Sequence, residues 1–426
     1  MRSEAYDVAT IDAASVQRKV VGTLVSSQVL SGVGMASGIA VGALLAEQLS
    51  GSEALAGLGT TAQVLGGALI AIPTARIMAA RGRRLGLEFG YALAVVGALV
   101  VIAAAVIGSF WLMLVGMLLF GGGTAGNGQA RYAAADLATD AHRGRDLSIV
   151  VWATTIGSVL GPNLIGPGQA LARAIGIPDL AGSFVFSVAG FVLALLVINR
   201  LLRPDPLLVS RAIASSDPHA PDLDHDGSLT RGIRVLRANV DARLGMLAAA
   251  LGHVVMVGVM VMTPIHMRHG DAGLGLIGFV ISMHIAGMYA FSPLVGLAVD
   301  RWGGRIVARA GGVILTVAVL AAGASQAGWS WTLLIALFLL GVGWSCTFVA
   351  GSTMLTAALS PEGRPAVQGV TEVTMGTMAA GGGALAGVVM QQFQYGALGL
   401  GASVVGVAVV LLTLLRRRQP ADGGTH

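Results

Sequence analysis

Charged side chains inside apolar stretches are the residues of this sequence with the clearest chemical potential. Glu372, Arg131 and Asp136 each lie within a long apolar run. In hydrocarbon, each charge costs a few kcal/mol and normally needs a partner or a water-filled cavity. A carboxylate at such a depth can carry a proton, because desolvation favours its neutral form. Glu372 can equally form an ion pair with Arg131 as a latch, or reach solvent, and the sequence leaves these interpretations open.

Polar and aromatic residues near the middle of the apolar runs are candidates for the lining of a small-molecule cavity. A histidine can sense or carry a proton near neutral pH, and the methionines nearby would give such a cavity a soft, adaptable wall. For each residue taken alone, a hydrogen bond to a neighbouring helix is the commoner role. The candidates are Gln28, Gln63, Asn127, His253, His284 and Trp344.

The elements that must position these side chains are membrane-spanning helices. The chain has 426 residues, of which 55% are hydrophobic and only 11% are charged, whereas about a quarter of the residues of a soluble domain are charged. The apolar residues form about a dozen stretches of roughly 20 to 28 residues, each long enough to cross a hydrocarbon core of about 30 Å. We therefore predict an all-α membrane protein with twelve transmembrane helices.

The predicted spans fall into two six-helix bundles. We expect a tail at 1–19, bundles at 20–202 and 244–415, a polar linker at 203–243 and a second tail at 416–426. Nearly all of the 26 Lys and Arg residues lie in the tails, the linker and the loops on one side. By the positive-inside rule, this predicts cytoplasmic termini. The excess of Arg over Lys is typical of a GC-rich bacterial genome, so we expect a multi-pass protein of the bacterial inner (plasma) membrane.

The two bundles resemble each other at a single offset of 221 residues. Parallel halves related by an axis along the membrane normal are typical of transporters, which hold the substrate between the halves near the midplane. The offset also places Gln63 on His284. Among the loop and glycine pairs that share it are Gly82 with Gly303, Arg84 with Arg305, Arg143 with Arg364, and Gly161 with Gly382.

The segment from Gly296 to Arg305, which contains Asp300 and Arg301, resembles the cytoplasmic loop signature G-x-x-x-D-R/K-x-G-R-R/K of the major facilitator superfamily. The resemblance implies two six-helix bundles, transport by alternating access, and a gating role for these charged residues. The counterpart at 75–84 keeps the basic residues but lacks the leading glycine and the aspartate. The first loop therefore lacks the residue to which the resemblance would assign gating.

Asp300 also has a physical role that does not depend on the resemblance. Its carboxylate can pair with a neighbouring arginine or cap a helix start when the cytoplasmic side is closed. A solvated basic loop that only sets topology is the alternative. The candidates for proton coupling or gating are thus Glu372, Arg131, Asp136, Asp300, Arg301 and Arg305.

A glycine-rich segment in the fifth predicted span contains Gly157, Gly161, Pro162 and Gly166. It is similar to the G-x-x-x-G-P-x-x-G-G pattern of the superfamily's proton-coupled drug exporters. Its glycines leave a bare helix face that allows close approach of another helix, and its proline kinks the span. We expect this face to lie between the halves, where it would let one half rock on the other; ordinary packing of small residues is the alternative.

The leading functional interpretation is a secondary active transporter that exports small hydrophobic or amphipathic compounds in exchange for protons. Proton-coupled uptake of a specific metabolite is the alternative. A receptor or an enzyme is disfavoured, because the spans contain no convergent catalytic or cofactor constellation. We expect the protein to act as a monomer in the lipid bilayer, with a small-molecule substrate and protons as its partners.

Other binding partners are disfavoured by the sequence. Its basic residues are scattered over short loops, which argues against nucleic acid. The acidic segment Asp222–Gly227 resembles the start of a calcium-binding loop, but the twelfth position holds Ile233 in place of glutamate. We therefore expect no metal site and no cofactor.

Overall fold

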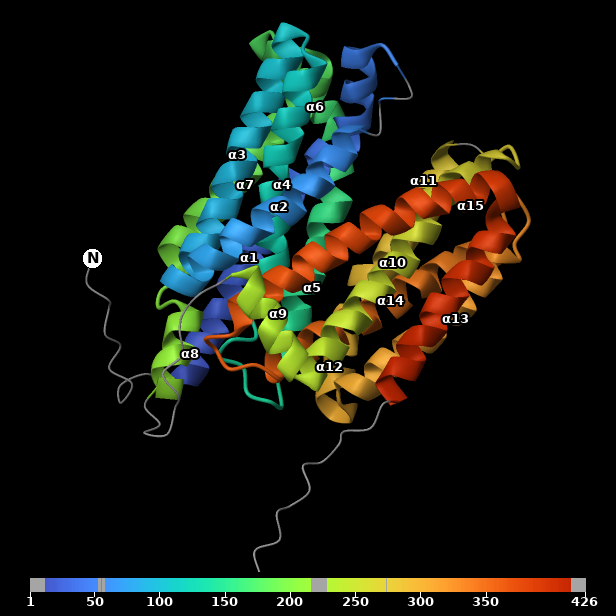
Figure 1. Cartoon of the computed structure of the whole chain (residues 1–426). Helices are drawn as coiled ribbons and strands as arrows, with labels where there is room; N and C mark the ends of the chain where they lie inside the picture. The colour runs from blue at the N-terminus through green and yellow to red at the C-terminus, as the bar shows by residue number, and fades with distance from the viewer. Residues whose placement is uncertain (1–11, 53–54, 56–57, 216–227, 273, 415–426) are drawn as a thin grey trace, which may run out of the picture.

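The computed structural model describes residues 12–52, 55, 58–215, 228–272 and 274–414. Most of both predicted tails and the acidic segment Asp222–Gly227 lie outside these residues. Every regular element in the described part of the chain is a helix (Figure 1). The α-helices are α1 (Ala13–Ser50), α2 (Leu58–Arg81), α3 (Arg83–Ile107), α4 (Phe110–Ala133), α5 (Arg143–Asn163), α6 (Ile165–Ile175), α7 (Gly182–Leu201), α8 (Pro206–Ser215), α9 (Leu229–Ala238), α10 (Val240–Arg268), α11 (Leu274–Tyr289), α12 (Ser292–Trp302), α13 (Gly304–Gly323), α14 (Trp331–Ala357) and α15 (Arg364–Leu414).

The described helices supply the twelve spans that the apolar pattern predicts. Ten helical segments are long and apolar enough to cross a membrane, and α5 and α6, bent by 59° at their junction, form an eleventh. The twelfth arises because α15 has 51 residues and would be about 77 Å long if straight, more than twice the hydrocarbon thickness. Gln394 interrupts α15 with a φ of 65°, so α15 consists of two arms. The predicted fold class is confirmed.

The internal repeat is visible in the helix boundaries. The helices α3, α4 and α5 begin at residues 83, 110 and 143, and α13, α14 and α15 begin at 304, 331 and 364. Gly82 and Gly303, which precede α3 and α13, have φ angles of 89° and 85°. Such positive values favour glycine, and they show that the two turns have the same backbone conformation.

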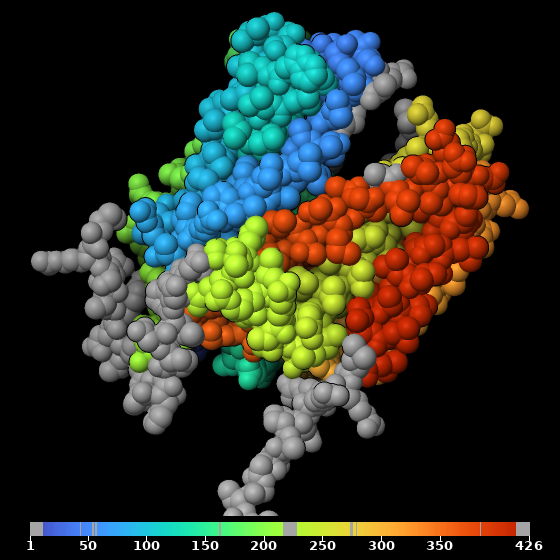
Figure 2. Space-filling model, viewed as in Figure 1, coloured from blue at the N-terminus to red at the C-terminus, as the bar shows by residue number. Residues whose placement is uncertain are grey.

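The two halves meet at one end of the molecule and diverge toward the other (Figure 1). One apolar core joins α1 to α7, and a second joins α10 to α15 and also includes Leu147 and Val151 of α5. The end that carries α8, α9 and the loops after α2, α4, α12 and α14 is called the linker face, and the opposite end is called the open face. Figure 2 shows a wedge-shaped opening between the halves at the open face. The contacts between the halves are made chiefly by α5 with α12 and by α2 with α15.

The linker contains two helices that each pack on one half. Arg211 of α8 donates from Nη1 to the carbonyl oxygen of Ala79 (2.7 Å), at the end of α2. Gly232 of α9 lies against Ala366 of α15. The second bundle begins at Val240, earlier than the apolar pattern predicts, because the Asn239 side chain accepts from the Ala242 N–H and caps α10.

Candidate functional site

An ion pair joins the two halves near the linker face, between the last turn of α4 and the beginning of α15. Arg131 in the last turn of α4 contacts Glu372 of α15, with 2.5 Å between Nη2 and Oε1. Arg131 also donates from Nη2 to the Tyr132 hydroxyl (3.0 Å) and from Nε to the Ser352 hydroxyl (3.3 Å). Ser352 occupies the position equivalent to Arg131 in the second half. The sequence left three roles open for Glu372: proton carrier, latch with Arg131, or a side chain that reaches solvent. The structure favours the ion pair with Arg131 over contact with solvent, since the Glu372 side chain is only 16% exposed.

The close approach of Glu372 to α4 depends on Gly128. A Cβ atom at Gly128 would lie 2.8 Å from Oε2 of Glu372, which is too short for an ordinary contact. The same Cβ would lie 3.5 Å from Nη1 of Arg131. The glycine therefore provides the space in which the carboxylate and the guanidinium meet.

Aromatic side chains of the second half extend from this ion pair. The Arg131 guanidinium carbon lies 4.2 Å from the centre of the Phe348 ring, and Phe348 stacks on Trp344 with 4.4 Å between ring centres. The indole Nε1 of Trp344 donates to Nδ1 of His253 (3.0 Å). Because an indole nitrogen can only donate, His253 Nδ1 carries no proton here. We call Arg131, Glu372, Phe348, Trp344 and His253 the central cluster.

The structure brings four of the sequence-predicted residues together here: Arg131, Glu372, Trp344 and His253. Sequence reasoning missed Phe348, which lies one helical turn after Trp344 on α14. The spacing of four residues places both rings on one face of the helix, and this was the signal that could have identified it.

The predicted cavity residues of the first half bond to neighbouring helices within that half. Gln28 donates to the Thr154 hydroxyl (3.1 Å), and Gln63 donates to the Thr124 hydroxyl (2.7 Å). Asn127 accepts from Ser31 (2.7 Å) and from Tyr91 (3.1 Å). These bonds match the commoner interhelical role.

His284 of α11 lies apart from the central cluster and has a different hydrogen-bond partner from His253. Its Nδ1 lies 2.8 Å from the carbonyl oxygen of Leu337 on α14, and its side chain is buried. Gln63 makes the equivalent connection between α2 and α4, as the repeat predicts. Among the described residues, no three His, Cys, Asp or Glu side chains are grouped so that they could hold a metal ion.

Asp300 caps a helix of the opposite half. Its Oδ1 accepts from the Gly144 N–H (2.7 Å), and its Oδ2 accepts from the Arg145 N–H (2.8 Å). Both donors lie in the first turn of α5, where a carboxylate interacts favourably with the helix dipole. Of the two roles expected for Asp300, the structure therefore shows the helix cap. Arg301 is exposed, and Arg305 pairs with Asp241 of its own half (2.5 Å).

Asp300→Asn is expected to loosen the linker face. The change removes the charge opposite the α5 N-terminus, a contribution of about 0.3–1 kcal/mol. We expect labelling of a cysteine placed at the buried Ser148 of α5 to accelerate about two- to fivefold, measured with Cys346 replaced by Ser. Asp140→Asn is the control, because Asp140 is 93% exposed. An unchanged labelling rate would contradict a gating role for Asp300.

Asp136 lies beyond α4 and not inside a span, which corrects its predicted position. The helix ends at Ala133, and the Asp136 side chain is fully buried at the linker face. It accepts from Arg83 through Oδ2 (Nε, 2.7 Å) and Oδ1 (Nη2, 3.1 Å). Arg364 of the opposite half donates from Nη1 to Oδ1 (3.3 Å) and to the Asp136 carbonyl oxygen (3.0 Å).

Two glutamines complete this group of buried side chains. Arg83 donates to Gln129 of α4 (3.1 Å) and to Gln368 of α15 (2.8 Å). We call Arg83, Gln129, Asp136, Arg364 and Gln368 the Asp136 network. It joins both halves, and the sequence did not indicate this network, because its arginines lie in short basic loops of the kind that set topology.

The glycine face of α5 packs within the first half and not between the halves, contrary to the prediction. A Cβ at Gly157 would lie 2.6 Å from Cα of Gly32, and one at Gly161 would lie 2.7 Å from the carbonyl carbon of Ala36. Both neighbours belong to α1. Pro162 lies at the end of α5, next to the 59° bend, and its side chain lies outside the described part of the structure. The α1–α5 contact is therefore the close glycine interface.

Gly161→Leu is expected to destabilise the protein, because its side chain would collide with the α1 backbone. Overpacking typically costs about 1–3 kcal/mol. Gly166→Leu is the matched control, since a Cβ at Gly166 would meet no atom within 4 Å. The thermal unfolding midpoint in detergent should fall for the first variant and stay near the parent value for the second. Equal midpoints would refute the packing argument.

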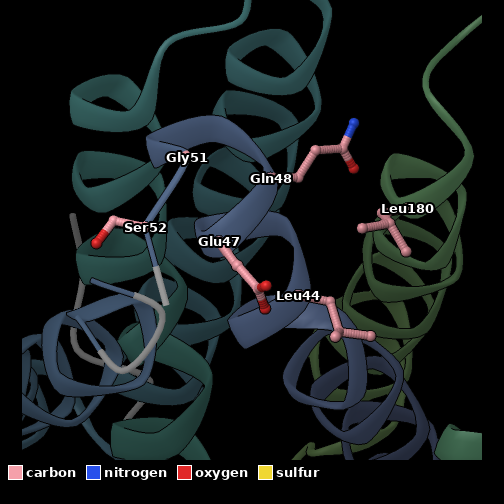
Figure 3. Close-up of a pocket in the computed structure, with 6 residues that line it drawn as sticks. All are labelled: Leu44, Glu47, Gln48, Gly51, Ser52 and Leu180. Atoms are coloured by element: carbon pink, nitrogen blue, oxygen red, sulfur yellow. The ribbon is translucent and has the colours of Figure 1, made fainter. Parts of the chain in front are cut away.

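A surface cavity of about 570 Å³ lies at the open-face end of α1 (Figure 3). It contains none of the sequence-predicted residues and is separate from the central cluster. Figure 3 shows Leu180 and Ser52 on opposite sides of the view, with Glu47 of α1 between them. The lining residues are Leu44, Glu47, Gln48, Gly51, Ser52 and Leu180.

Comparison with known proteins agrees with this architecture. The model of the Major Facilitator Superfamily matches residues 24–283 and 270–425. The MFS-type transporter YddS of Bacillus subtilis is 38% identical over 92% of this chain and 89% of its own length. The riboflavin transporter RfnT of Brucella anthropi is 28% identical over 86% and 88%.

Solved structures show the same fold at lower identity. The human organic anion transporter MFSD10 superposes with a TM-score of 0.73 at 16% identity, over 93% of this chain and 99% of that one. At this identity the likeness concerns the fold alone. The family model and the close relatives carry the assignment: the chain belongs to the major facilitator superfamily of transporters.

Proposed function

We propose that this transporter couples the movement of a small molecule to the movement of protons, and that Glu372 carries the proton. The observation that supports this most directly is the Arg131–Glu372 pair, an ionisable contact between the two halves. Protonation would neutralise Glu372 and weaken its attraction to Arg131. Since alternating access separates the halves on one side at a time, a titratable link between them can couple protonation to that motion.

The proposed orientation places the linker face in the cytoplasm of a bacterial inner membrane. The basic residues of the linker-face loops support it by the positive-inside rule. With this orientation, the wedge at the open face faces outward, and Asp300 and the Asp136 network close the cytoplasmic side. The protein is proposed to work as a monomer, because the opening lies between two halves of one chain.

For the substrate, we propose small hydrophobic or amphipathic aromatic compounds. The buried aromatic rings of the central cluster, Phe348 and Trp344, support this class. Export in exchange for protons is supported by the similarity of the α5 glycine segment to the drug-exporter pattern. Uptake of a specific metabolite is the second candidate, and the 28% sequence identity to a riboflavin transporter supports it.

Proteoliposomes with an internal pH dye test this proposal. Lipophilic cations, neutral aromatic drugs, aromatic carboxylates and riboflavin are added outside in turn. Exchange for protons makes the lumen more alkaline as the compound enters, and transport together with protons makes it more acidic. Protein-free liposomes report passive permeation. No protein-dependent pH change with any compound, in the presence of folded protein, would overturn proton coupling.

A further inference from the structure

The charge balance of the central cluster limits which substrates it can accept. Arginine stays charged at any physiological pH. Arg131 is 6% exposed, and its charged partner is Glu372. In the proposed cycle Glu372 takes up a proton, which leaves the buried Arg131 charge without that partner. A buried charge that loses its partner is strongly destabilised, so the protonated state needs another anion beside Arg131.

We infer that the transported compound is an aromatic anion, which takes the place of Glu372 on Arg131 when Glu372 takes up a proton. This inference rests on the proposed proton coupling and adds the charge class of the substrate. A carboxylate is the simplest such anion, because it fits the planar fork of a guanidinium.

The aromatic part of the inference follows from the rings around Arg131. Phe348 lies under the guanidinium at 4.2 Å and Tyr132 at 4.4 Å. Trp344 continues the stack, with an angle of 19° between its plane and that of Phe348. Tyr289 meets Trp344 edge to face at 5.5 Å. A planar ring can extend such a stack while its anionic group faces Arg131.

Other titratable groups near Arg131 are poor proton carriers. His253 of α10 and Tyr289 of α11 lie within electrostatic range of Arg131, and Tyr132 bonds to it directly. His253 Nδ1 already accepts the indole N–H of Trp344, so a proton there would break that bond. The two tyrosines are neutral hydroxyls that a physiological proton does not charge. Glu372 is therefore the group in the cluster suited to take up the proton.

The charge of the cluster stays constant only if one proton accompanies each anion. Before binding, Arg131 and Glu372 neutralise each other. After binding, the anion neutralises Arg131, and Glu372 is neutral. Proton and substrate then bind together and move in the same direction. This favours the second candidate, proton-coupled uptake, over export in exchange for protons.

Direct binding measurements on the purified protein test the charge class separately from transport. The probes are benzoate, 1-naphthoate and 9-anthracenecarboxylate, with the ammonium compounds of the same three ring systems as matched cations. Calorimetry in two buffers of different ionisation enthalpy counts the protons taken up. We expect the anions to bind, about one proton to enter per anion, and the affinity to fall up to tenfold per pH unit as the pH rises.

Two variants assign the proton and the anion to their residues. In Glu372→Gln, anion binding should persist without proton uptake and without pH dependence. In Arg131→Gln, the anion affinity should fall at least tenfold. Asp140→Asn should behave like the parent protein.

Three results would overturn the inference: binding of the cations with proton release, binding of neither series at any ring size, or unchanged proton uptake in Glu372→Gln. In the first two cases, a protein-dependent pH change in proteoliposomes would still support proton coupling with another substrate class. Absence of that pH change would instead overturn the proposed function.

Discussion

Glu372→Gln is expected to reduce substrate-driven proton movement at least tenfold, to the level of protein-free liposomes, while the protein stays folded. Glutamine has nearly the same shape as glutamate, and its carbonyl oxygen can still accept from Nη2 of Arg131. It cannot take up a proton. The variant therefore separates the proton-carrying role of residue 372 from its contact with Arg131.

The measurement compares luminal pH and substrate content in the same proteoliposomes. Substrate exchange across the membrane at equal concentrations should continue in Glu372→Gln, because the halves can still alternate. Asp140→Asn controls for the loss of a carboxylate at a solvated position. If proton movement were unchanged in Glu372→Gln, Glu372 would be a latch and the proton carrier would have to be sought elsewhere.

The fold could be predicted because two strong sequence signals agree. Apolar runs give the number and length of the spans, and the repeat offset gives the boundaries of α3 to α5 and α13 to α15. The local sequence was less informative about the exact residues at which helices begin and end. α10 begins early because Asn239 caps it, and Asp136 follows α4 because the helix ends at Ala133.

The candidate site was predictable only in part. The depth of Arg131 and Glu372 along their spans could be counted from the sequence, so their pairing was one of the expected outcomes. The sequence did not show which neighbouring helix each helix face contacts, because nearly every face of these helices is apolar. For this reason the glycines of α5 were expected between the halves, although Gly157 and Gly161 contact α1.

The largest loss of stability is expected for Asp136→Ala. The Asp136 carboxylate is fully buried and pairs with Arg83 and Arg364. Its removal leaves two buried guanidinium groups without this carboxylate, and breaking a buried pair costs about 3–5 kcal/mol. The thermal unfolding midpoint in detergent should fall clearly. Asp140→Ala is the matched control four residues later, because the Asp140 side chain is 93% exposed and a carboxylate in water contributes at most about 1 kcal/mol. A midpoint for Asp136→Ala equal to that control would show that Asp136 contributes little.

Asp136→Ala should also open the linker face more than Asp300→Asn does, because Asp300 and the Asp136 network join the two halves in different ways. At the offset of 221 residues, Asp300 corresponds to Ala79, and Gly144, which donates to Asp300, corresponds to Pro365. Proline has no N–H to donate, so the cap that Asp300 forms on α5 cannot be repeated on α15. At that place, Arg364 and Gln368 of the Asp136 network join α15 to the first half.

Cysteine labelling measures the two contacts separately. One cysteine replaces Ser148, next to the Asp300 cap, and the other replaces Thr371, two helical turns into α15. Faster labelling at Thr371 in Asp136→Ala is the expected result, and a response confined to Ser148 would refute the division of roles.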